Sequence, residues 1–140
     1  MKNILVIDGQ GGGVGRSLIE RLRAKLPSAE IHAVGTNAMA TAAMLRAGAS
    51  TGATGENAVI IASRRAKIIA GPLGIAIANS MMGEFTPQMA AAVAESDADR
   101  VLVPINRCGT YVAGSTELSL GQAVEQAAEL IVQLWDGAQP

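Results

Sequence analysis

The sequence contains few of the residues that build disulfides, zinc sites and catalytic triads. Cys108 is the one cysteine and His32 the one histidine. A lone cysteine excludes a disulfide within the chain, and these two residues cannot supply the ligands of a Cys/His zinc site. His32 falls within a predicted strand, which leaves no base for an ordinary Ser-His-Asp triad or for a nucleophilic cysteine. We therefore expect no metal site of this kind.

Aromatic and basic residues are also scarce. Aromatic side chains make up 2% of the sequence, and 11 Lys and Arg against 12 Asp and Glu give a net charge of −1. The basic residues do not gather into a run, and the nearest approach, at 63–67, is predicted to be a solvated loop. A nucleic-acid-binding surface needs a basic patch, and single strands need rings to stack on. We therefore predict no nucleic-acid partner.

Long apolar runs are missing as well. A membrane-spanning helix needs a run of about 20 apolar residues, and every apolar run in the sequence is much shorter. The first residues already have the pattern of a buried strand instead of a secretory leader. We therefore expect a cytoplasmic protein with no membrane segment.

The composition that remains is typical of a globular domain with small side chains. Hydrophobic residues make up 49% and charged residues 16% of the 140 residues, which predicts one folded domain over 1–140. With so few rings, alanine, aliphatic residues and six methionines must fill the core. Alanine-rich helices pack closely, and we expect a homo-oligomer in which such helices or the flexible stretch at 81–85 meet between subunits.

Strand and helix patterns alternate along the chain. Short apolar runs bounded by glycine or turn residues predict buried parallel strands, and apolar residues at helical spacing predict helices between them. The predicted fold is an α/β, three-layer, Rossmann-like domain with a mostly parallel sheet of four to five strands and right-handed crossovers. Strands are expected at 3–7, 31–34, 67–70 and 100–105, and helices at 14–26, 38–47, 87–95 and from 120 onward.

Two of these helix starts are marked by capping residues. Thr86 before Pro87 is a favourable N-cap followed by proline in the first turn. Ser119 followed three residues later by Gln122 fits a capping box.

The segments between the elements are less regular. Residues 49–57 are polar and contain glycine, which is typical of a loop that closes over or contacts a ligand. Residues 59–61 fit either a short strand or one helical turn, and Glu56 near the start of the segment favours a short helix. Residues 111–113 fit a short edge strand.

The most informative segment is the one that follows the first strand. Five glycines fall within the seven residues 9–15, just before the first predicted helix. The first N–H groups of a helix lack partners within it and carry partial positive charge, and glycine lets an anion approach the backbone. We expect the amides of residues 11–15 to hold an anion, with Arg16 adding charge. A tight turn that needs glycine only for its conformation is the alternative.

Two nucleotide-binding templates fit this loop incompletely. The dinucleotide fingerprint needs a third glycine where Val14 or Arg16 stands, and an acid after the second strand, where residues 34–37 offer none. The loop also resembles the deviant Walker motif of partitioning-type ATPases, which it matches at residues 12–15. Both characteristic lysines of that motif are replaced, the second of them by Arg16, and Gln10 stands where the P-loop has its first glycine, so ATP hydrolysis is not expected.

Further polar residues are expected at the same edge of the sheet. Parallel strands all end on one edge, so the turns after them should meet the glycine loop there. Thr36 and Asn37 could contact a ribose or a second phosphate, although either residue is also a good helix cap. The predicted ligand-binding residues are Gly9, Gln10, Gly11, Gly12, Gly13, Val14, Gly15, Arg16, Thr36, Asn37, Pro72 and Asn106.

No residue is assigned a catalytic role. Asp8 ends the first strand, and such an aspartate more often accepts hydrogen bonds from loop amides than binds a metal or acts as a base. Cys108 follows Arg107, which would favour its thiolate, but the base is missing. Glu84 could face the cleft, with nothing in the sequence to position it.

Four segments are distinctive beyond their place in the fold: Ile7–Gly15, Val34–Asn37, Ala53–Asn57 and Gly71–Gly74. Through them the whole chain resembles a family of short bacterial proteins with no assigned function. The resemblance implies a Rossmann-like domain and leaves the activity open.

The residues together predict a protein that binds a small anionic ligand, namely a nucleotide or dinucleotide. Without an acid after the second strand, NADP is slightly preferred over NAD. One alternative is a small lyase, isomerase or synthase acting on a phosphorylated metabolite, with Asp8 or Glu84 as general base. Another is a non-catalytic homodimeric module that senses a metabolite.

Overall fold

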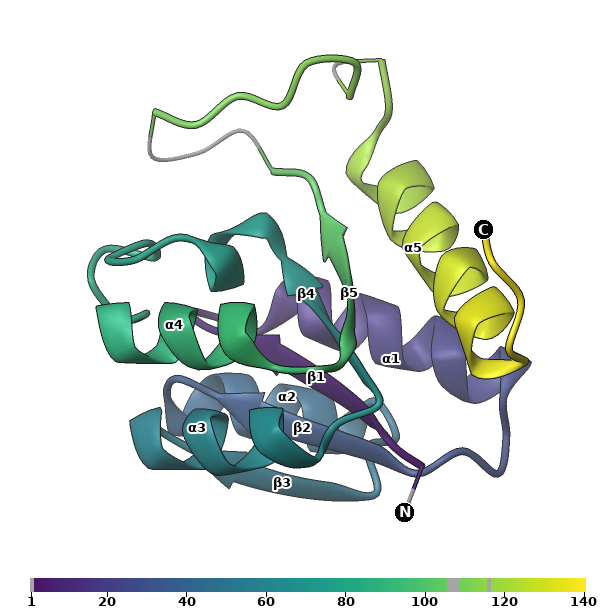
Figure 1. The fold of residues 1–140 in the computed structure, drawn as a ribbon, viewed down its shortest axis with the longest axis horizontal. Helices are drawn as coiled ribbons and strands as arrows, with labels where there is room; N and C mark the ends of the chain where they lie inside the picture. The colour runs from purple at the N-terminus through teal and green to yellow at the C-terminus, as the bar shows by residue number, and fades with distance from the viewer. Residues whose placement is uncertain (1, 106–108, 116) are drawn as a thin grey trace.

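The structure is a computed structural model that describes residues 2–105, 109–115 and 117–140 (Figure 1). Within these residues, five parallel strands form one sheet in the order β3-β2-β1-β4-β5. This confirms the predicted α/β, Rossmann-like fold with a parallel sheet. The strands are β1 (Ile4–Asp8), β2 (Ile31–Gly35), β3 (Thr51–Thr54), β4 (Ile68–Pro72) and β5 (Asp99–Val103).

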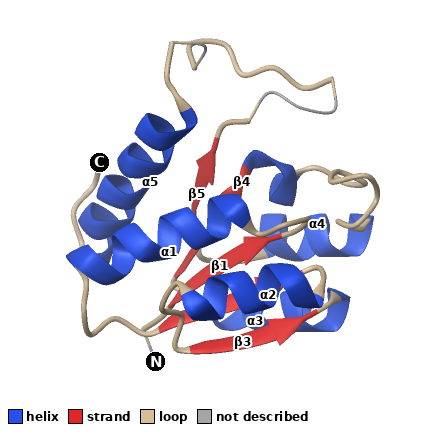
Figure 2. Ribbon diagram, turned by 180° about the vertical axis from the view of Figure 1, so that it is seen from behind, coloured by secondary structure: helices blue, strands red, loops and turns tan. Residues whose placement is uncertain are grey.

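Helices cover both faces of the sheet and make three layers (Figures 1 and 2). One core cluster packs α1, α2 and α5 against the sheet, and a second packs α3 and α4 against the other face. The helices are α1 (Gly13–Lys25), α2 (Ala38–Arg46), α3 (Glu56–Arg65), the short 3-10 helix η1 (Leu73–Ala76), α4 (Pro87–Glu95) and α5 (Leu120–Trp135). Among the described helices none is long and apolar enough to cross a membrane.

β1 lies at the centre of the sheet, and all five of its residues are buried. A strand covered by helices on both faces needs apolar side chains on both sides, which is why residues 4–7 are a continuous apolar run. The chain leaves β1 for β2 and β3 on one side, then returns to β4 and β5 on the other. The connections therefore diverge between β1 and β4, and a crevice at the carboxyl ends of these strands is where such sheets bind ligands.

The polar segment 49–57, predicted to be a loop, contains the edge strand β3. Its four residues are all exposed, so no apolar alternation marks it in the sequence. Main-chain pairing with β2, from His32 opposite Thr51 to Gly35 opposite Thr54, makes it a strand. An edge strand can have exposed side chains because its pairing uses only the backbone.

Three further predictions concern the connecting segments. The helical interpretation of 59–61 is confirmed, since these residues lie within α3. The solvated loop predicted at 63–67 is wrong for its first residues, because α3 continues to Arg65 and Ser63 is buried. The edge strand predicted at 111–113 is also wrong, because the chain turns there instead: the Ser115 backbone N–H and hydroxyl both donate to the Val112 carbonyl, and Gly114 has a φ of 86°.

The two predicted helix starts are confirmed. Thr86 caps α4, and its hydroxyl oxygen accepts a 3.2 Å hydrogen bond from the Met89 backbone N–H. Ser119 caps α5, where its side chain accepts from the Gln122 backbone N–H and the Gln122 side chain accepts from the Ser119 N–H. Each pair satisfies backbone donors that the helix itself leaves unpaired.

Candidate functional site

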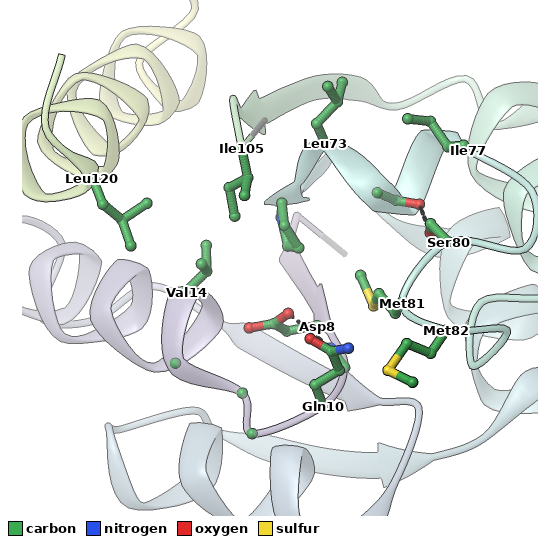
Figure 3. Close-up of a pocket in the computed structure, with 16 residues that line it drawn as sticks. Asp8, Gln10, Val14, Leu73, Ile77, Ser80, Met81, Met82, Ile105 and Leu120 are labelled. Carbon is green, nitrogen blue, oxygen red and sulfur yellow. Dashed lines mark hydrogen bonds between the residues drawn. The ribbon is translucent and has the colours of Figure 1, made fainter. Parts of the chain in front are cut away.

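A cavity of about 560 Å³ opens at the carboxyl ends of β1 and β4, at the predicted edge of the sheet (Figure 3). The floor is the loop after β1, residues 8–14, and the turn from β4 into η1, residues 72–74, lines another side. Apolar side chains make most of the remaining wall. They are Leu73, Ile77, Met81, Met82, Ile105 and Leu120, joined by the hydroxyl of Ser80.

Asp8 is the one charged residue among the described residues that line this cavity. Its Oδ1 accepts a 2.7 Å hydrogen bond from the Gly9 N–H, and its Oδ2 accepts a 2.7 Å hydrogen bond from the Gly15 N–H. Burial raises the pKa of the carboxyl above its usual 3.8, the amides of Gly15 and Gly9 partly offset this rise, and the nearby Glu84 adds to it. Asp8 thus acts as the acceptor for loop amides, which is the commoner of its expected roles.

Three of the loop glycines lie in tight contact with neighbouring elements, and at Gly12 the contact is with backbone. A Cβ at Gly12 would lie 2.8 Å from the Ala40 Cα, and Gly12 has a left-handed φ of 73°. A Cβ at Gly15 would lie 2.6 Å from the Met44 Sδ, and one at Gly9 2.5 Å from the Met81 Sδ. These glycines let α2 and the segment before α4 approach the loop closely.

The other two loop glycines have no such structural reason. A Cβ added at Gly11 or Gly13 would meet nothing within 4 Å, and neither residue has a positive φ. Both residues are exposed and line the cavity. Among the described residues, neither backbone N–H has a hydrogen-bond partner. The two glycines therefore leave space and donors at the start of α1, where a helix favours negative charge.

The predicted cradle of amides from residues 11 to 15 is therefore smaller than expected. The Gly12 N–H donates to the Gly9 carbonyl at 2.9 Å, and the Gly15 N–H is bound by Asp8. These amides are used inside the loop because the chain must turn sharply between β1 and α1. Arg16 does not line the cavity either, since its side chain is exposed and lies 3.9 Å from Glu20 one turn along the helix.

Thr36 and Asn37 lie beside the glycine loop, but both contact a residue that sequence reasoning left unplaced. Glu84 Oε1 accepts hydrogen bonds from the Gln10 N–H at 2.8 Å, the Thr36 hydroxyl at 2.5 Å and the Asn37 Nδ2 at 3.1 Å. These bonds, the one from Thr36 first, lower the pKa of the Glu84 carboxyl. Neither Thr36 nor Asn37 lines the cavity. Asn37 also caps α2, because its Oδ1 accepts from the Ala40 N–H.

The remaining predicted residues divide into described and undescribed ones. Pro72 is the last residue of β4 and lines the cavity. Gln10 and Val14, in the loop and helix after β1, line it as well. Asn106 lies outside the described residues, as does Cys108. No group of three or more His, Cys, Asp and Glu side chains in the described part of the chain is arranged to hold a metal ion.

The same fold occurs in a solved flavoprotein. The dodecameric FMN-dependent UbiX-like decarboxylase from Escherichia coli O157:H7 superposes with a TM-score of 0.54, over 98% of this chain and 96% of that one. The sequence identity is 16%, so the likeness shows the fold alone. No curated protein sequence matches the chain. Residues 3–136 match a family described as "Domain of unknown function (DUF3842)". This match confirms the resemblance to a family with no assigned function. The protein belongs to that family.

Proposed function

We propose that this protein binds a nucleotide in the cavity, with a phosphate on the backbone amides of Gly11 and Gly13. The observation that carries the proposal is that these two glycines meet no neighbour that would exclude a Cβ, line the cavity, and have N–H groups from which no described residue accepts a hydrogen bond. Glycine at such a position is explained by an anion that approaches the backbone more closely than a Cβ would allow. The start of α1 adds its partial positive charge to this place.

The apolar wall favours a ligand with a flat ring system. The cavity volume lies within the about 300–1,000 Å³ of small-molecule sites. Its wall offers aliphatic and thioether groups, with the Ser80 hydroxyl already donating to the Gly74 carbonyl. Such a surface suits an aromatic ring more than a sugar. We therefore place FMN first, the cofactor on which the structurally similar decarboxylase depends.

The dinucleotides NADP and NAD come second. A dinucleotide would have to displace Glu84 from Thr36 and Asn37 before these side chains could contact its second half. An arginine for a 2′-phosphate and an acid for ribose hydroxyls are both missing from residues 34–37. A mononucleotide requires neither group.

A binding role fits better than a role for Asp8 as general base in an enzyme acting on a phosphorylated metabolite. Each oxygen of its carboxylate already accepts an amide hydrogen bond. A general base must come within hydrogen-bond distance of the proton it removes, and Asp8 is buried and held by these amides. A homo-oligomer is compatible with this role, because the cavity mouth exposes Met82 and Leu120, which a second copy could cover.

Isothermal titration calorimetry with FMN, riboflavin, ADP, ATP, NAD and NADP tests the proposal. We expect FMN to bind, and riboflavin, which lacks the phosphate, to bind at least about tenfold more weakly, since two charge-assisted hydrogen bonds are lost. Gly13→Ala should weaken FMN binding and leave riboflavin binding unchanged. Gly121→Ala is the matched control, because Gly121 also lies in the first turn of a helix and a Cβ there meets nothing closer than 3.8 Å. No binding of any of these nucleotides at millimolar concentration would refute the proposal.

A further inference from the structure

Three hydrogen-bond donors of the sheet edge converge on a single oxygen. The Gln10 N–H, the Thr36 hydroxyl and the Asn37 side-chain amide all point at Glu84 Oε1, at 2.8, 2.5 and 3.1 Å. They come from the two loops that follow β1 and β2, while the acceptor comes from the segment before α4. Several preset donors around one charged oxygen are the arrangement by which proteins bind oxyanions.

The donors are held in place without Glu84. The Thr36 backbone N–H donates to the Asp8 carbonyl at 3.0 Å, which fixes the loop after β2 to the end of β1. Asn37 Oδ1 accepts from the Ala40 N–H, and Asn37 Nδ2 also donates to the Gln10 carbonyl at 2.9 Å. The orientation of the donor set is therefore determined by the sheet edge and by α2, and it would survive the departure of the carboxylate.

The segment that carries Glu84 is strained and exposed. Met81 and Met82 both have a left-handed φ of 57°, which residues other than glycine and asparagine rarely adopt. Strain of this kind collects where a segment has more than one use. Met82 is 92% exposed and Glu84 is exposed, whereas Phe85 next to it is fully buried and anchors the segment.

The donor site adjoins the cavity. A Cβ at Gly9 would meet Met81 Sδ, Thr36 Oγ1 and Glu84 Oε1, all within 3.0 Å, so these atoms surround one glycine of the loop. Met81 also lines the cavity. Movement of the segment 80–84 away from Gly9 would therefore join the donor site to the cavity.

We propose that the carboxylate of Glu84 is an internal stand-in for a second phosphate, separate from the one on Gly11 and Gly13, which displaces it and binds the Gln10 N–H, Thr36 and Asn37. The site takes a phosphate dianion, carried by the terminal phosphate of a nucleoside diphosphate or by a separate phosphorylated metabolite. The inference rests on the proposed function in one respect, since the displacing phosphate belongs to a ligand of the same cavity. The donor site itself is accessible to inorganic phosphate, so it is testable alone.

The experiment measures the affinity of inorganic phosphate by calorimetry for the wild type and four variants. Glu84→Ala vacates the donors and should bind phosphate at least about tenfold more tightly than the wild type. Thr36→Val in the Glu84→Ala background removes one donor and should abolish most of this gain. Glu56→Ala is the matched control, because Glu56 is another exposed glutamate that accepts a hydrogen bond from a threonine, Thr86, and its removal should not change phosphate binding.

Glu84→Asp tests whether phosphate is kept out by the carboxylate's hydrogen bonds to the donors or by its negative charge. The variant keeps the carboxylate but shortens the side chain by one methylene, which withdraws it from the donors. This variant should also bind phosphate more tightly than the wild type. It serves as the primary comparison if Glu84→Ala does not fold. Two outcomes would overturn the inference: unchanged phosphate affinity in the variants at Glu84, or a gain in Glu84→Ala that survives Thr36→Val. Either outcome would mean that Glu84 only holds the segment before α4 against the loops after β1 and β2.

ADP and ribose 5-phosphate, titrated into the same proteins, distinguish the sources of the second phosphate. Tighter binding of ADP by Glu84→Ala identifies a nucleotide with two phosphates, and tighter binding of ribose 5-phosphate alone identifies a sugar phosphate. If inorganic phosphate gains affinity as expected while no nucleotide binds any variant, the proposed function fails and this inference stands. If FMN binds the wild type and Glu84→Ala equally, with inorganic phosphate also unchanged, the inference fails and the proposed function stands.

Discussion

Asp8 and Gly15 are joined by a 2.7 Å hydrogen bond from the Gly15 backbone N–H to the Asp8 carboxylate, which ties the end of β1 to the first turn of α1. The other carboxylate oxygen binds the adjacent Gly9 N–H. The loop between these points is thus held in shape by its own hydrogen bonds, and no described residue accepts a hydrogen bond from the Gly11 or Gly13 N–H. A preset loop of this kind binds an anion without first having to become ordered.

Asp8 should make stability depend on pH in an unusual direction. Because burial raises its pKa above 3.8, the folded protein holds a proton on this group at pH values where the unfolded chain has released it. The contribution of Asp8 to the free energy of unfolding should therefore decrease as the pH rises from about 3.8 through the raised pKa. Urea unfolding of the wild type and Asp8→Asn across this range measures the difference, in which the titration of other groups largely cancels. A difference that is constant with pH, or that favours the wild type more at higher pH, would contradict the assigned burial of the charge.

Gly12 and Gly13 should respond oppositely to the same substitution. Gly12→Ala places a Cβ against the Ala40 backbone and forces alanine into a left-handed conformation, so we expect a loss of about 1–3 kcal/mol or more in the free energy of unfolding. Gly13→Ala meets nothing and reduces the entropy of the unfolded chain, so we expect no loss and a gain of up to about 1 kcal/mol. Chemical denaturation of both variants tests the pair, and equal losses would show that the loop has a different conformation.

Phe85 should be an anchor of the segment before α4. Its side chain is fully buried in the cluster between the sheet, α3 and α4, so Phe85→Ala should cost about 3–5 kcal/mol in the free energy of unfolding. The exposed Met82 three residues earlier is the matched control, and Met82→Ala should change stability by less than about 0.5 kcal/mol. Denaturant midpoints would decide this, and similar effects of the two substitutions would contradict the placement of the segment.

Thr86 should contribute through its cap. Thr86→Ala removes the oxygen that accepts from the Met89 N–H and should destabilise the protein by about 1 kcal/mol. Thr86→Ser keeps an acceptor oxygen and should recover most of the loss. If the serine variant is as unstable as the alanine variant in thermal unfolding, the effect does not come from capping.

Much of the fold could be predicted because it is encoded in short-range patterns. The apolar run of β1, the proline after Thr86 and the capping box at Ser119 each identify an element by neighbours in the sequence. β3 could not be predicted in this way. Its residues Thr51–Thr54 are polar or small and exposed, and the pairing with β2 that makes them a strand uses only backbone groups.

The glycine loop shows a different limit of sequence reasoning. The five glycines are alike in the sequence, but Gly12 and Gly15 serve contacts with Ala40 and Met44, which depend on where α2 packs. The role of Glu84 was equally hidden, because it reaches Gln10 only through a segment with left-handed backbone at positions that are not glycine. The sequence predicted the edge of the sheet at which the cavity opens, and tertiary packing decides which residues line it.

The most direct test of the account is an NMR titration of the ¹⁵N-labelled protein with FMN, followed at the backbone amides. We predict that the Gly11 and Gly13 amides show the largest shifts and that both saturate at one common dissociation constant, because their N–H groups become hydrogen-bonded to phosphate. The Gly12 and Gly15 amides, which are already bonded within the loop, should move less. Saturating FMN that leaves Gly11 and Gly13 unmoved, or no binding at all, would contradict the account.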